Sequence, residues 1–112
     1  MTEQQILDRH IAAVNAVAAG GDAEQLAGGL TADCTMTFVG IPVGPFEGRE
    51  AVVAAYRANP PDDQVVVLDS SFGEGRIEAT YAWSAEPDRP AGRVLLELDG
   101  DLVKAWTVDY WA

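Results

Sequence analysis

Hydrophobic residues recur at helical spacing near the start of the chain. Apolar side chains at every third or fourth position over residues 6–18 predict an amphipathic helix. Thr2, with Gln5 three residues later, forms a capping-box pattern just before it. The glycine pair 20–21 ends the helix. The chain therefore opens with one long helix that has a single apolar face.

Two further helices are predicted before strands dominate the sequence. Asp22 caps a short helix that ends at the glycine pair 28–29. A third helix is predicted over residues 49–57, with an apolar side that includes Tyr56. Asn59, followed by two prolines, ends this third helix.

The rest of the chain has the pattern of β-strands. Strands are predicted over residues 34–39, 64–68, 76–84, 92–98 and 102–110. The run 64–68 is continuously apolar, which is typical of a strand buried on both faces. Asp99-Gly100, between the last two strands, is a strong hairpin signal. Helices followed by an antiparallel meander predict a single α+β domain over residues 1–112.

The charge balance narrows the choice of partners and compartment. Eighteen acidic and seven basic residues give a net charge of −11, which repels nucleic acid and anionic membranes. No apolar stretch is as long as a membrane span, and the first residues lack the pattern of a signal peptide, so we expect a cytoplasmic protein. One histidine and one cysteine exclude a zinc site built from several such ligands in one chain, and no phosphate- or dinucleotide-binding motif occurs. We therefore expect neither a metal nor a cofactor.

Several short strings resemble the SnoaL-like branch of the nuclear transport factor 2-like superfamily, and the resemblance covers nearly the whole chain. They are RHIAAVN at 9–15 with GD at 21–22, LTAD at 30–33, GPFEGREA at 44–51 and DGDLV at 99–103. The resemblance implies a cystatin-like cone, in which a curved antiparallel sheet wraps the long helix and leaves a pocket open at one end. Members include ketosteroid isomerases, polyketide cyclases, limonene epoxide hydrolases and dehydratases, and also proteins that only bind or assemble.

Ketosteroid isomerase gives the sharpest comparison, because the resemblance implies fixed places for its site residues. Its first-helix tyrosine corresponds to His10, its proton-moving carboxylate falls at or beside Phe38, and its late-strand acid falls near Val94. Only Tyr56, on the third helix, matches. Because neither phenylalanine nor valine can carry a proton, we do not expect steroid isomerisation by that mechanism. The Asp-Arg-Asp arrangement of limonene epoxide hydrolases fails similarly, since Val94 and Leu96 occupy the expected inner face of the late strands.

Three side chains remain candidates for catalysis: His10, Tyr56 and Asp109. His10 lies on the apolar face of the first helix, as either a core histidine bonded to a backbone carbonyl or a pocket group. Asp109 shares a strand face with Thr107. If that face lines the cone, burial raises the pKa of the Asp109 carboxyl toward the range that suits general acid–base catalysis. The alternative is that Asp109 lies at the frayed, solvent-exposed end of its strand. The expected lining residues of the pocket are Val14, Met36, Phe38, Tyr81, Trp83, Val94 and Leu96.

The last two strands carry a second apolar set, which comprises Leu95, Trp106, Val108 and Tyr110. On the outer face of the cone these side chains would form a patch that monomers rarely expose. We therefore expect a homodimer that buries this outer face. The alternative is that the parity of the last strand is inverted and that these residues form the core.

Together these features predict a protein that binds a small, mostly apolar molecule. The sequence leaves open whether the chain also catalyses an isomerase, cyclase or hydrolase reaction. The alternative is a non-catalytic binding or assembly module whose cone is filled by its own aromatic side chains. Two polar groups that converge in an open cavity favour an enzyme, and a collapsed, dry core favours the module.

Overall fold

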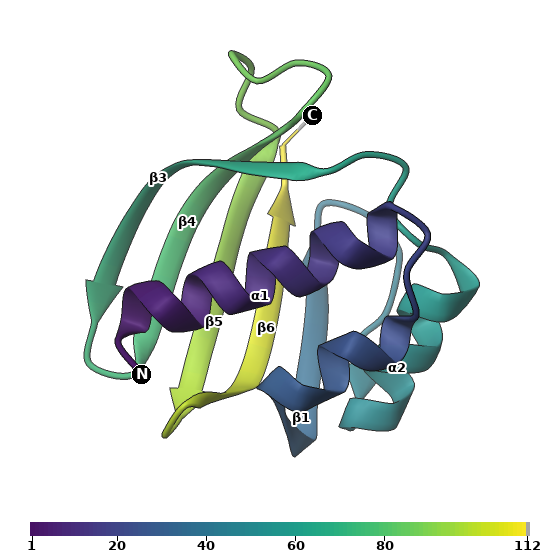
Figure 1. The fold of residues 1–112 in the computed structure, drawn as a ribbon, viewed down its shortest axis with the longest axis vertical. Helices are drawn as coiled ribbons and strands as arrows, with labels where there is room; N and C mark the ends of the chain where they lie inside the picture. Colours follow the sequence, from purple (N-terminus) through teal and green to yellow (C-terminus); the bar gives the residue numbers. More distant parts are fainter. Residues whose placement is uncertain (112) are drawn as a thin grey trace.

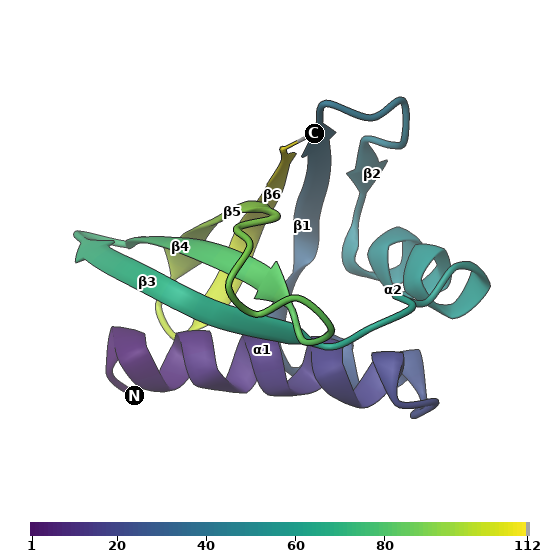
Figure 2. The ribbon, with the colours of Figure 1, turned by 90° about the horizontal axis from the view of Figure 1, so that it is seen from above.

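Six strands form one curved sheet, and the long first helix crosses one of its faces (Figures 1 and 2). The computed structural model describes residues 1–111. Its elements are α1 (Glu3–Ala18), the 3-10 helix η1 (Ala23–Gly29), β1 (Leu30–Val39), β2 (Phe46–Glu47), α2 (Arg49–Ala58), β3 (Val65–Gly73), β4 (Arg76–Trp83), β5 (Gly92–Asp99) and β6 (Leu102–Tyr110). The predicted α+β architecture, with one long helix against a curved sheet, is confirmed.

The capping box predicted for α1 is present. The Thr2 hydroxyl accepts a hydrogen bond from the Gln5 backbone N–H at 3.1 Å, and the Gln5 side chain accepts one from the Thr2 N–H at 2.8 Å. The buried stripe of the helix, which includes Leu7 and Val14, packs in the core against the sheet. No helix within residues 1–111 is both long and apolar enough to cross a membrane.

The strand order in the sheet is β2-β1-β6-β5-β4-β3. The meander from β3 to β6 is antiparallel throughout, and the Asp99-Gly100 turn joins β5 to β6 as predicted. β1 pairs with β6 in parallel, so the expectation of a wholly antiparallel sheet is wrong at this one pair. Local sequence patterns do not encode the direction of a pairing between strands so far apart in the chain, which is why they missed it.

β3 differs from the strand expected over residues 64–68. It lies at the edge of the sheet, pairs only with β4, and is partly exposed along its whole length. Val65, Val66 and Val67 are therefore half-buried and Leu68 is exposed, rather than all being covered on both faces. The strand also continues to Gly73, because backbone pairing with β4 carries it through the polar residues that follow. The two-residue strand β2 was not predicted.

A single extra residue in β6 reverses the parity that the sequence suggested. Regular pairing from Asp99↔Leu102 would place Trp106 opposite Leu95, but a bulge at Lys104 shifts the register by one residue. Trp106 therefore pairs with Leu96 on the inner face. A shift of one residue moves every side chain beyond it to the other face of the sheet.

The predicted outer patch is consequently wrong for three of its four residues. Trp106 and Val108 are only 2% and 8% exposed and lie in the core, while Tyr110 lines the cavity described below. Leu95 alone remains on the outer face, paired with Thr107.

Candidate ligand-binding cavity

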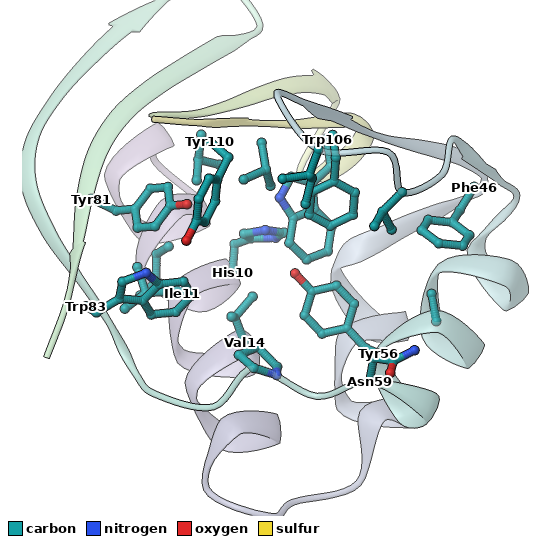
Figure 3. Close-up of a pocket in the computed structure, with 18 of the residues that line it drawn as sticks. His10, Ile11, Val14, Phe46, Tyr56, Asn59, Tyr81, Trp83, Trp106 and Tyr110 are labelled. Carbon is teal, nitrogen blue, oxygen red and sulfur yellow. The ribbon is translucent and has the colours of Figure 1, made fainter. Parts of the chain in front are cut away.

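A cavity of about 430 Å³ lies between α1, α2 and the inner face of the sheet. Aromatic side chains surround it (Figure 3). The chain has three Trp, three Tyr and three Phe, and seven of these nine line the cavity: Phe38, Phe46, Tyr56, Tyr81, Trp83, Trp106 and Tyr110. The cone is therefore open, although most of the aromatic residues of the chain point into it.

The walls of the cavity carry no charged side chain among the residues that the structure describes. The polar lining consists of His10, Asn59, the hydroxyls of the tyrosines and the indole N–H groups of the tryptophans. An ion inside such a cavity would lose its hydration without gaining a charged partner. The cavity therefore suits an uncharged, mostly apolar molecule.

His10 lies in the middle of α1 and is 5% exposed. Its ring packs edge-on against Trp106, with 4.2 Å between the ring centroids. The Nε2 atom is buried and has no hydrogen-bond partner in residues 1–111. Burial, together with the nearby charge of Arg9, lowers the pKa of His10 to about 4, so the imidazole is uncharged at neutral pH.

Trp106 projects from β6 toward His10 and Tyr56. Its ring lies 5.1 Å from the Tyr56 ring, tilted by 32°. The indole Nε1 is buried and donates to no atom of the described chain. This residue was not predicted for the site, because no sequence pattern marks the bulge that turns it inward.

Tyr56 comes from α2, and its hydroxyl points into the cavity toward His10 and Trp106 (Figure 3). Burial, and secondarily Tyr81, raises the pKa of Tyr56 above its ordinary value. Burial also raises the pKa of Tyr81 to about 12, with smaller contributions from Tyr110 and Asp109. Both phenols therefore stay protonated at neutral pH and can donate hydrogen bonds.

The structure brings most of the predicted site residues together. Val14, Phe38, Tyr81, Trp83 and Val94 line the cavity, as do His10 and Tyr56. Met36 and Leu96 were also expected in its wall, but they pack in the core behind the lining and do not border the cavity.

Asp109 does not face the cone, so this expectation is wrong. The bulge that turns Trp106 inward turns Asp109 outward, where it pairs with Arg93 across the sheet. The Arg93 guanidinium lies 3.5 Å from the Asp109 carboxylate and 2.8 Å from that of Glu78. Asp109 thus belongs to a row of ion pairs on the outer face and lies outside the cavity.

The mouth of the cavity includes loop residues that sequence reasoning missed. Ile41 and Val43, in the segment after β1, and Asn59 and Pro61, after α2, all border it. Periodicity predicts helices and strands but not the path of a loop, so no pattern marked these residues. The glycines and prolines around them only indicated that the chain turns there.

Side chains from α1 and from the α2–β3 loop hold this rim in place. Asn15 donates to the Val65 carbonyl at 3.0 Å and accepts from the Val65 N–H at 2.7 Å, so α1 fixes the start of β3. The Asp63 carboxylate accepts hydrogen bonds from the Ser84 hydroxyl and the Ala85 N–H, which lowers the pKa of Asp63. These bonds position the backbone beside Val65, which lines the cavity.

Comparisons with known proteins identify the fold. The sequence matches no family model and no curated protein. Among solved structures, a nuclear transport factor 2-like protein of unknown function from Cytophaga hutchinsonii is 16% identical with a TM-score of 0.77, covering 99% of this chain and 91% of that one. A cystatin-like fold protein of unknown function from Methylobium petroleophilum is 12% identical with a TM-score of 0.73, covering 97% and 75%.

A third similar structure is a hypothetical protein with a ketosteroid isomerase-like fold from Catenulispora acidiphila, in complex with trimethylamine. It is 17% identical with a TM-score of 0.70, covering 99% of this chain and 88% of that one. These likenesses define the class of fold: the chain has the nuclear transport factor 2-like, cystatin-like cone. The resemblance inferred from the sequence is confirmed for the fold.

Proposed function

We propose that this chain binds a small, mostly apolar organic molecule in the cone. The observation that carries the proposal is the open cavity of about 430 Å³, walled by aromatic and aliphatic side chains. Small-molecule sites measure roughly 300–1,000 Å³ and have mostly apolar walls with a few polar groups. A module with a filled cone would leave no such volume, so the cavity favours binding over that alternative.

A protein of the same fold that binds a small molecule also supports the proposal. The neighbour from Catenulispora acidiphila is in complex with trimethylamine, a small amine that is protonated near neutral pH. A cone of this architecture is thus compatible with a small organic ligand.

Catalysis through His10 and Tyr56 is the second candidate function. Its support is that the buried Nε2 of His10 has no partner in the described chain and that the Tyr56 hydroxyl points toward it. An isomerase, cyclase or hydrolase would have to use this pair, because no carboxylate among residues 1–111 lines the cavity. A histidine with a pKa of about 4 is a weak base at neutral pH, so we place binding first.

Filling the cavity tests the proposed function. The neutral dye N-phenyl-1-naphthylamine fluoresces in apolar surroundings and serves as the probe. Val108→Trp should weaken dye binding at least tenfold, because Val108 lines the cavity. Val39→Trp is the matched control, since Val39 lies on the neighbouring strand and pairs with the outward-facing Asp109. Absence of saturable dye binding, or equal binding by both variants, would contradict the proposal.

A further inference from the structure

The inner end of the cavity holds a donor without an acceptor. The indole of Trp106 can only donate a hydrogen bond, and its side chain is almost wholly buried. Its Nε1 has no acceptor in the part of the chain that the structure describes. Because buried donors are nearly always hydrogen-bonded, this atom calls for a partner that the chain itself does not provide.

The neighbours of Trp106 add hydrogen-bonding capacity without charge. The Tyr56 hydroxyl points toward the same inner end, and its raised pKa keeps it protonated (Figure 3). The His10 ring lies 4.2 Å from the Trp106 ring and is uncharged at neutral pH. An acceptor atom on a ligand at this point would meet neutral donors on a wall that is otherwise apolar.

Charge and hydrogen-bonding capacity disfavour an ionic group beside the Trp106 N–H. An anion would enter a protein with a net charge of −11 and find no cationic side chain among the described lining residues. A cation can lie against the aromatic faces, but an ammonium group has no lone pair to accept from the Trp106 N–H and would meet the positive end of that dipole, and no described lining residue carries a carboxylate. An uncharged oxygen is the acceptor that fits.

We infer that the ligand is an uncharged molecule with a hydrocarbon body and a carbonyl or hydroxyl oxygen at its inner end, and that the Trp106 indole N–H selects it by donating to that oxygen. This inference rests on the proposed function and specifies its ligand. It makes Trp106 the specificity-determining residue of the cavity.

A rigid series of ligands with one shape tests the chemistry of the inner end. 2-Adamantanone, adamantane, 1-adamantanecarboxylate and 1-adamantylammonium would each displace N-phenyl-1-naphthylamine at a salt concentration of about 0.15 M, which screens long-range charge. The ketone should bind about tenfold more tightly than adamantane, and the carboxylate should bind most weakly. Equal binding of ketone and adamantane, or tightest binding of the ammonium, overturns the inference but leaves the proposed function standing. Failure of the dye itself to bind overturns both.

Two matched variants test the role of Trp106. Trp106→Phe removes the buried N–H and should abolish the preference for the ketone. Trp111→Phe removes an N–H from a tryptophan that is 42% exposed and does not line the cavity, and it should keep the preference. Loss of the preference in both variants, or in neither, contradicts the assignment.

A readout on the unmodified protein does not depend on either variant folding. Trp83, Trp106 and Trp111 give three indole N–H signals in a proton–nitrogen NMR spectrum. On titration with 2-adamantanone the Trp106 signal should move downfield, and adamantane should cause a much smaller shift. A Trp106 signal that responds equally to both compounds overturns the inference.

Discussion

At the scale of single residues, the environment of His10 matters more than its identity. Histidine in water is half-protonated near neutral pH, whereas burial beside Trp106 and the charge of Arg9 hold His10 uncharged. The sequence predicted its place on the apolar face of α1, because helical spacing is a local property. It did not predict whether Nε2 would find a backbone partner, which depends on side chains from distant strands.

The lowered pKa of His10 makes stability depend on pH. Between pH 6.5 and about 4 the unfolded chain binds a proton at His10 that the folded chain does not, so the free energy of unfolding falls as the pH falls through this window. A shift of this size corresponds to about 3 kcal/mol lost between pH 7 and 4. Urea unfolding of the wild type and His10→Phe at several pH values measures it. As the pH falls from 7 to 4, the free energy of unfolding of the wild type should fall relative to that of His10→Phe. A difference between the two proteins that does not change with pH would contradict this prediction.

At the scale of elements, neighbouring residues specify turns and helix ends, but they do not specify which strands pair. The capping box, the glycine stop and the Asp99-Gly100 hairpin are written in neighbouring residues, so α1 and the β5–β6 connection were predictable. The parallel pairing of β1 with β6 joins distant segments. The bulge at Lys104 is a single extra residue, and no residue type or spacing marks it in the sequence. Because the bulge was not predicted, Trp106 and the residues of β6 that follow it were assigned to the wrong face of the sheet.

The bulge yields a test of what sets the inner face of β6. Deleting Lys104 removes the extra residue and leaves Ala105 opposite Glu97 and Trp106 opposite Leu96, so Trp106 and Val108 stay on the inner face. This variant should fold. Deleting Thr107 instead keeps the bulge and moves Val108 opposite Leu95 on the outer face, which exposes an apolar side chain whose burial is worth about 1.5–3 kcal/mol. Against a typical total stability of about 5–15 kcal/mol, thermal unfolding followed by circular dichroism should show a much larger loss for the Thr107 deletion than for the Lys104 deletion. Equal losses in the two deletion variants would contradict this account of the register.

At the scale of the whole molecule, the two faces of the sheet have different roles. α1 lies against the inner face, while the helices leave the outer face of the central strands uncovered (Figure 2). The outer face carries Leu95 and Thr107 beside the ion pairs of Arg93 with Glu78 and Asp109. Trp106, Val108 and Tyr110 do not support a dimer, because those side chains belong to the core and the cavity.

The homodimer therefore stays a prediction, and it now rests on the uncovered sheet face around Leu95. Such a dimer has to bury about 800 Å² on each partner, and the charge of −11 on each chain opposes it. Sedimentation should show an association that tightens from low to high salt as this repulsion is screened. Leu95→Glu should give a folded monomer, while Ala12→Glu, on an exposed position of α1, should still dimerise.

In the same experiment, Trp106→Glu tests whether Trp106 lies in the core or on the outer face of the sheet. It would place an unpaired carboxylate at a buried position in the cavity wall, so this variant should fail to fold rather than give the folded monomer that an outer position would allow. A wild type that sediments as a monomer at tens of micromolar, or a Leu95→Glu protein that still pairs, would remove the outer face as an interface. Neither result would alter the assignment of Trp106 to the inner wall, because that assignment follows from the β5–β6 register alone.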